Sequence, residues 1–368
     1  MRTVRRLLYR DIVNAVAFVA LAFLSLFYFI DFVETLDSLG RRGRGGNATA
    51  AAWLSLLELP GHFYELFPIA VLIGSIFALA RLAQSSEFTI LRTGGLGPWR
   101  ALGLLSTLAA AFAVTTFVVG DYVAPHFDRH ADAQRAIYAG NPAGRTGIRG
   151  VWLKDKQLTP AGERSFSVNV GNVRDGGQLE RVRIFEFDNL GALRARIEAA
   201  QATVDAEGLW RLRDVRRTEW RADRVAEQTL ESLDWASGLD VGVISAAVSP
   251  PQNMSTAELY RYTAHLSAHE QSAQQHDIQF WRKALYPFAC FVMVALALPF
   301  AYLHSRNGGI SLKVFGGIML GISFVLLNNL AGHLGMLKGW TPWAVAATPS
   351  LIYLAISLAA FGWLVRYR

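Results

Sequence analysis

The sequence predicts an α-helical membrane protein with six transmembrane helices and an inserted all-β domain, which is a sandwich, a jelly roll or an open barrel. Two observations support this fold class. The 368-residue chain is 52% hydrophobic, and its apolar residues gather in several runs of the roughly 20 residues needed to cross a bilayer. Between these runs, residues 126–275 carry short alternating segments separated by turn residues, a pattern typical of a β domain.

Basic residues are concentrated at the flanks of the apolar runs. Residues 126–275 hold 19 Lys and Arg against 20 Asp and Glu, whereas the rest of the chain holds 17 against 9. The positive-inside rule therefore places both termini and residues 81–100 in the cytoplasm and residues 126–275 outside. The same distribution argues against nucleic-acid binding. Cys290 is the only cysteine, which excludes an intramolecular disulfide.

The first part of the chain, residues 1–125, contains three predicted spans. They cover residues 12–33, 63–82 and 101–123. The first apolar run is too long for the hydrophobic region of a secretory signal peptide, so it is interpreted as a span. A polar, Gly-rich connection is expected at residues 36–60. Its arginines, Arg41, Arg42 and Arg44, fall on the outer side, against the charge rule.

Residues 81–100, between spans two and three, predict a short amphipathic helix at about 84–95. Ser85 or Ser86 can cap its start, and Glu87 in the first turn suits the positive end of the helix dipole. Phe88 and Leu91 share one face. The stop signals are Gly94, Gly95 and Pro98. An ordinary interfacial linker has the same pattern, so the residues alone do not assign it a function.

The second part, residues 126–275, is expected to form six to ten strands followed by a polar helix at about 255–275. The clearest strand segments are 151–153, 166–170, 182–187, 193–197, 209–212 and 218–220. The third part, residues 276–368, contains the remaining spans. Their apolar runs lie at about 284–303, 310–334 and 343–365.

Catalytic chemistry is not indicated. The chain has no phosphate-binding loop, no His-Glu-x-x-His sequence and no convincing nucleophile with a base, so it is not expected to be an enzyme. His265, His269 and His276 have metal-ligand spacing on the polar helix. They are interpreted as polar surface, as are His126 and His130, and no metal site is predicted.

Polar and aromatic residues in or next to the predicted spans are better candidates for functional residues. Asp31 and Glu65 lie close to the predicted outer interface and are most simply solvated helix ends. Asn328 and Asn329 are expected to form interhelical hydrogen bonds. The phenylalanines of the first span, Phe18, Phe23, Phe27 and Phe29, suit a core or lipid-facing position, and could also line a cavity for acyl chains.

Three segments, taken with the six-span layout, resemble one family. They are Phe-Pro-Ile-Ala-Val-Leu-Ile-Gly at 67–74, Leu-Ala-Gln-Ser-Ser-Glu-Phe-Thr-Ile-Leu-Arg-Thr-Gly-Gly at 82–95, and Gly-Val-Trp-Leu-Lys-Asp at 150–155. Over essentially its whole length the chain is similar to the LptF/LptG permease subunits of the lipopolysaccharide-export ABC transporter. The second segment, and Phe-Ile-Asp-Phe-Val-Glu-Thr-Leu at 29–36, are nearer to the LptG members than to the LptF members.

The resemblance implies a jelly-roll-like periplasmic domain at residues 126–275, and it implies roles for particular residues. The helix after span two would dock on an LptB-type ATPase, with Glu87 as its acidic contact. The implied coupling residues are Ser86, Glu87, Phe88, Leu91 and Arg92. Spans one and five would line a lateral gate, for which the candidates are Phe27, Ile30, Asp31, Glu34, Phe67, Phe315 and Phe324. The sequence departs from the family at Asp31, where a lysine often stands. The nearest basic candidates for the lipid headgroup are Arg41, Arg42 and Arg44.

The expected function is therefore that of an inner-membrane permease subunit that extracts lipopolysaccharide and passes it to a periplasmic bridge. The implied partners are an LptF-type permease, two copies of an LptB-type ATPase, an LptC-type single-span protein and the bridge. ATP and Mg would be used by the ATPase, with no cofactor on this chain. The alternative is a signalling or mechanotransmission protein with a periplasmic sensor domain.

Overall fold

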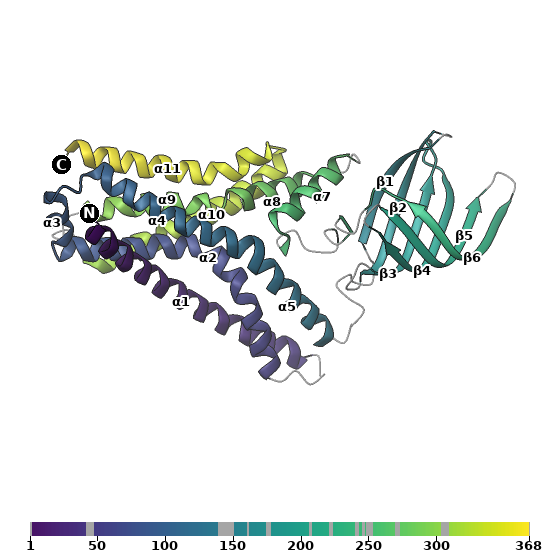
Figure 1. Cartoon of the computed structure of the whole chain (residues 1–368), viewed down its shortest axis with the longest axis horizontal. Helices are drawn as coiled ribbons and strands as arrows, with labels where there is room; N and C mark the ends of the chain where they lie inside the picture. The colour runs from purple at the N-terminus through teal and green to yellow at the C-terminus, as the bar shows by residue number, and fades with distance from the viewer. Residues whose placement is uncertain are drawn as a thin grey trace. The chain divides into compact units, whose positions relative to one another are not determined.

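The computed structural model of the chain forms two compact units (Figure 1). The helical unit comprises Met1–Ser38, Asn47–Asp128 and Asp277–Arg368, and the β unit is chiefly Arg129–His276. The structure describes residues 2–41, 48–138, 151–159, 162–173, 178–205, 208–220, 224–239, 243–244, 247, 253–268, 273–302 and 309–367.

Within these described residues, five helices are long and apolar enough to cross a membrane. They are α1 (Arg2–Arg41), α2 (Ala48–Gln84), α4 (Pro98–Val118) with its continuation, α10 (Ile310–Lys338) and α11 (Pro342–Tyr367). A sixth span results if α8 (Gln274–Leu285) and α9 (Phe288–Tyr302), which meet at a 52° bend, are counted together. The 15 residues of α9 alone rise only about 22 Å, less than the ~30 Å hydrocarbon core. The predicted fold class, an α-helical membrane protein with an inserted all-β domain, is confirmed.

The first two spans are longer helices than the sequence indicated. Helix α1 continues to Arg41 and α2 begins at Ala48, so most of the predicted polar connection at 36–60 is helical, and that prediction was wrong in extent. The reason is local, because Ala48, Ala50, Ala51 and Ala52 give the start of α2 a high helix propensity. Pro60 is accommodated inside α2.

Helix α2 is the centre of the helical unit, and 78% of its most apolar stretch is buried. Close approach of neighbouring helices depends on glycine. A Cβ added to Gly74 of α2 would lie 2.6 Å from the backbone of Val16 in α1, and one added to Gly317 of α10 would lie 2.7 Å from Ile76. Small residues of this kind let membrane helices pack through extensive van der Waals contact.

Helix α4 continues through a π-helical turn, η1 (Val119–Val123), into α5 (Ala124–Tyr138). Gly120, inside this turn, lies against the ring of Tyr64, where an added Cβ would come within 2.2 Å of ring carbons. Only a glycine lets the π-turn and Tyr64 approach so closely.

The β unit is one antiparallel sheet in which the described strands pair in sequence order. They are β1 (Val151–Thr159), β2 (Gly162–Val173), β3 (Gln178–Phe187), β4 (Leu193–Val204), β5 (Leu209–Trp220) and β6 (Val225–Ala236). The predicted segments 209–212 and 218–220 are parts of the single strand β5. Strand β6 was not predicted, because most of its residues are exposed and it lacks an apolar alternation. Trp210 is fully buried and donates from Nε1 to the carbonyl of Leu239 at 3.0 Å.

Two sets of local hydrogen bonds are notable in the β unit. Helix α7 (Thr256–Ala268) starts with a capping box, because Ser255 Oγ accepts from the N–H of Glu258 and Glu258 accepts from the N–H of Ser255. Arg129 Nη2 of α5 also donates to both oxygens of Glu258, at 2.8 and 2.9 Å. In the β3–β4 turn, the hydrogen bond from the N–H of Ala192 is the main cause that lowers the pKa of Asp188.

Candidate functional site

Helix α3 (Glu87–Thr93) joins α2 to α4 at the end of the helical unit where the chain starts (Figure 1). The predicted side-chain cap is wrong for Ser86, which makes no cap hydrogen bond. Its backbone is left-handed, with φ of 63°, whereas an N-cap hydroxyl reaches the first turn from the extended conformation. Ser85 Oγ donates instead to the carbonyl of Leu82 at 3.3 Å.

The end of α3 is set by glycine, as the stop signals predicted. The N–H of Leu96 donates to the carbonyl of Leu91 at 3.0 Å, and the N–H of Gly95 donates to that of Arg92 at 3.1 Å. These two bonds form a Schellman motif, which needs a left-handed residue between them. Gly95 supplies it with φ of 100°.

The apolar face of α3 packs into its own chain. Phe88 is 4% exposed and meets the ring of Tyr302 in α9 edge to face, with centroids 5.1 Å apart. Leu91 is half-buried against the same core, and the guanidinium of Arg92 lies 5.8 Å from the centre of the Tyr302 ring. Phe88, Leu91 and Arg92 therefore fix α3 to the transmembrane helices.

The opposite face of α3 combines charge and apolar area. Glu87 is exposed, and Ile90, one turn later, is 67% exposed. We call these two residues the α3 surface. Sequence reasoning missed Ile90, although its spacing of three residues from Glu87 was an available signal.

At the other end of α1, two predicted gate residues contact α2. Asp31 Oδ2 lies 2.6 Å from His62 Nε2, and the rings of Phe27 and His62 have centroids 5.0 Å apart. Ile30 and Glu34 are exposed on α1 instead. The structure therefore separates the four α1 candidates into two groups.

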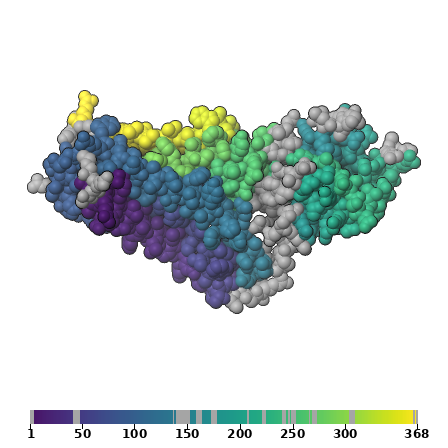
Figure 2. All heavy atoms as spheres, in the orientation of Figure 1, coloured from purple at the N-terminus to yellow at the C-terminus, as the bar shows by residue number. Residues whose placement is uncertain are grey.

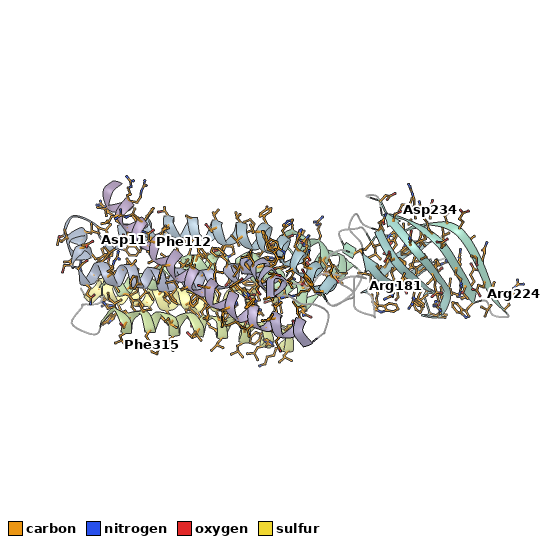
Figure 3. All side chains as sticks on the ribbon, turned by 90° about the horizontal axis from the view of Figure 1, so that it is seen from below. Asp11, Phe112, Arg181, Arg224, Asp234 and Phe315 are labelled. Carbon is orange, nitrogen blue, oxygen red and sulfur yellow. The ribbon has the colours of Figure 1, made fainter. Side chains whose placement is uncertain are left out.

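The remaining gate candidates also lie in different surroundings. Phe67 is buried with its ring edge-on to Phe112, and Phe324 is buried edge-on to Tyr353. Phe315 is 57% exposed at the periphery of the helical unit (Figure 3). Phe67 and Phe324 thus belong to the buried core of the helical unit, whereas Phe315 does not.

Some predicted residues cannot be placed. Arg42, Arg44 and His269 lie outside the described residues, and so do the side chains of Arg41 and His265. His276 is half-buried, with its ring 5.0 Å from that of Tyr262. The interhelical hydrogen bond expected of Asn329 is confirmed. Its Oδ1, on α10, accepts from Arg282 Nη2 of α8 at 3.2 Å.

The spans predicted to line a gate are the ones whose apolar faces are least covered. Only 11% of the most apolar stretch of α1 and 22% of that of α10 are buried, against 78% for α2. Helix α1 is seen along the surface of the space-filling view (Figure 2). These faces are left for lipid or for another protein.

Comparison with known proteins decides the family. The family model described as lipopolysaccharide export system permease LptF/LptG matches residues 6–364. The chain belongs to this family. The LptF/LptG resemblance noted in the sequence is therefore confirmed across nearly the whole chain, and with it the character of a multi-pass membrane protein.

Individual relatives in the LptF/LptG family point to one branch. The chain is 26% identical over 316 residues to the lipopolysaccharide export system permease protein LptG of Haemophilus influenzae, covering 84% of this chain and 86% of that protein. It is 27% identical over 318 residues to the LptG protein of Escherichia coli strain K12, covering 85% of each. The LptG-like segments at 29–36 and 82–95 agree with these matches.

Proposed function

We propose that this chain is the LptG-type permease subunit of an ATP-driven lipopolysaccharide exporter. With an LptF-type permease and two copies of an LptB-type ATPase, it extracts lipopolysaccharide from the inner membrane. An LptC-type protein and a periplasmic bridge then receive the lipid. The family match over residues 6–364 is the observation that carries this proposal.

Orientation follows from charge. Arg5, Arg6 and Arg10 precede the first apolar run, and Arg81, Arg92 and Arg100 surround α3. The positive-inside rule assigns these flanks to the cytoplasm and hence the β unit to the periplasm. The α3 surface then faces the compartment that holds ATP and Mg, both of which the partner ATPase uses.

The α3 surface is our candidate for coupling. A cytoplasmic partner can contact the exposed Glu87 and Ile90, while Phe88 of the same helix packs against Tyr302 of α9. Movement of the partner then passes to the transmembrane helices through packed side chains. Glu87 suits a basic residue on the ATPase, and losing one partner of a desolvated interfacial pair costs about 2–5 kcal/mol.

The test is affinity purification of the tagged chain co-expressed with its ATPase and second permease. Glu87→Arg is expected to lower the affinity for the ATPase about 30-fold or more, the equivalent of ~2 kcal/mol, because the acidic partner is lost and a like charge is introduced. ATP-dependent lipopolysaccharide export should fall with it. The matched control is Glu231→Arg, the same charge reversal at an exposed position of β6, which should retain the ATPase.

Two results would contradict the proposal at different levels. Normal ATPase recovery and normal export with Glu87→Arg would show that the α3 surface is not the coupling site. A parent complex that holds an ATPase but neither retains nor exports lipopolysaccharide would favour the signalling alternative.

A further inference from the structure

Three metal-ligating side chains from two helices meet where α1 and α2 approach the connection between them. Asp31 comes from α1, and Glu58 and His62 come from α2. One ligand atom of each, a carboxylate oxygen or an imidazole nitrogen, lies within 4.8 Å of the other two. We propose that Asp31, Glu58 and His62 form a binding site for a zinc-type divalent cation that fastens α1 to α2.

The helices position the three groups for a common ion. Glu58 and His62 are four residues apart in α2, which places them on one face, a turn apart. From α1, Asp31 and Phe27 are also four residues apart, and both contact the His62 ring. The imidazole is thus oriented by two groups of the facing helix, and its Nε2 points at the Asp31 carboxylate.

The donor set matches zinc. One imidazole nitrogen and two carboxylate oxygens make a three-ligand protein site, with a fourth position for water or an anionic ligand. Calcium and magnesium prefer oxygen ligands, so a set that includes an imidazole nitrogen suits them less.

The present spacing is close to that of a coordinated ion. Ligands about 2.0–2.1 Å from a tetrahedral ion are about 3.3 Å apart, so the 2.6 Å separation of Asp31 and His62 must widen by less than an ångström. The separations that involve Glu58 are at most 4.8 Å and must shorten by up to about 1.5 Å.

Charge and burial favour the same conclusion. The Asp31 and His62 side chains are only 14% and 24% exposed, and Glu58 is half-buried. Two carboxylates brought together in such surroundings repel each other, and a divalent cation compensates their charge. The site lies at the outer limits of the apolar runs 12–33 and 63–82, so an ion can reach it from water without entering the hydrocarbon core.

A cation here acts on a part of α1 that is otherwise sparsely covered. Phe29, Ile30 and Val33, next to Asp31, are 63%, 47% and 49% exposed. Bridging Asp31 to Glu58 and His62 therefore adds a strong cross-link where apolar packing is weak. This inference stands on the geometry of α1 and α2 and does not depend on the transport role.

The experiment uses the full chain purified in detergent and stripped of metal with a chelator. Zn²⁺ is titrated calorimetrically above pH 7, because ligands must lose their protons to bind a metal ion. The parent should bind one Zn²⁺ saturably at this site. Asp31→Asn and His62→Gln, which keep side-chain size, should each weaken binding at least about tenfold. The control is His333→Gln, an exposed histidine of α10, which should bind as the parent does.

A second measurement separates ligation from folding. Co²⁺ bound to the parent should give the intense visible absorption of a tetrahedral site, and Asp31→Asn should lose it while Glu231→Arg, in the β unit, keeps it. No saturable Zn²⁺ binding by the parent would overturn the proposal. So would parent-like affinity and Co²⁺ spectrum in both Asp31→Asn and His62→Gln, or an equal loss of binding in His333→Gln.

Discussion

Helices α1 and α2 have nearly the same length and apolar character, yet they lie in very different surroundings. Each contributes a 37-residue candidate span, but the most apolar stretch of α2 is 78% buried and that of α1 is 11% buried. Hydropathy selects the helices that enter the membrane. It does not decide which of them form the core, because lipid is as apolar as a neighbouring helix.

The difference in burial depends on how closely the side chains of neighbouring helices fit together. Burial also varies along α1. Leu8, Ile12 and Val16 are buried, and Val16 lies where Gly74 of α2 leaves room for it. Farther along, Phe18 and Leu21 are 74% and 68% exposed. The part of α1 up to Val16 thus belongs to the core, whereas Phe18 and Leu21 offer apolar surface to lipid or to another protein.

The sharpest test of this contrast uses the same substitution in both helices. Leu72→Ala in α2 removes a fully buried side chain and should lower the free energy of unfolding by about 2–4 kcal/mol through lost packing and a cavity. Leu21→Ala in α1 should change it by less than about 0.5 kcal/mol. Reversible unfolding in mixed micelles measures both. Equal losses of unfolding free energy would contradict the contrast, because they would mean that Leu21 is packed as closely as Leu72.

A smaller loss is expected where the two helices touch. Gly74→Ala forces a methyl group against the Val16 backbone and should cost about 1–3 kcal/mol in the same assay, because one helix must shift. Gly103→Ala, in α4, is the control, since nothing lies within 4 Å of its added Cβ. It should be neutral or stabilising by up to about 1 kcal/mol. A neutral Gly74→Ala would show that α1 does not pack on α2 at this point.

An ion pair also joins α1 to α2. Arg81 Nη2 lies 3.2 Å from Asp11 Oδ2, and the arginine side chain is 54% exposed. A double-mutant cycle with Arg81→Gln and Asp11→Asn should give a coupling energy below about 1 kcal/mol, reduced further by salt. A larger coupling energy would mean that electrostatics, rather than the fit of Val16 to Gly74, holds this part of α1.

Much of the architecture was predictable from composition. Apolar runs located the spans, and alternating segments located the β unit, since both signals are averaged over many residues. The features that were not predicted depend on single residues or on exposed surface. The 52° bend between α8 and α9 and the unpredicted strand β6, whose exposed surface carries no apolar alternation, left no clear periodic signal.

The candidate sites show the same limit. Glu87, Phe88 and the glycine stop of α3 are encoded locally, so they could be predicted. The left-handed backbone of Ser86 could not, because it results from the tight reversal between α2 and α3. The cluster of Asp31 with Glu58 and His62 joins residues about 30 positions apart, and only the Glu58–His62 spacing was visible in the sequence.

Because α1 packs closely on α2 where Val16 meets Gly74, a tilt of α1 about this contact displaces residues farther along the helix. Asp31 lies 15 residues beyond Val16, about 22 Å along a helix. At that radius a tilt of about 2° moves Asp31 by roughly 0.8 Å, which stretches its 2.6 Å hydrogen bond to His62 nearly to the limit of such bonds. A tilt of α1 of about 2° is therefore enough to make or break the hydrogen bond between Asp31 and His62.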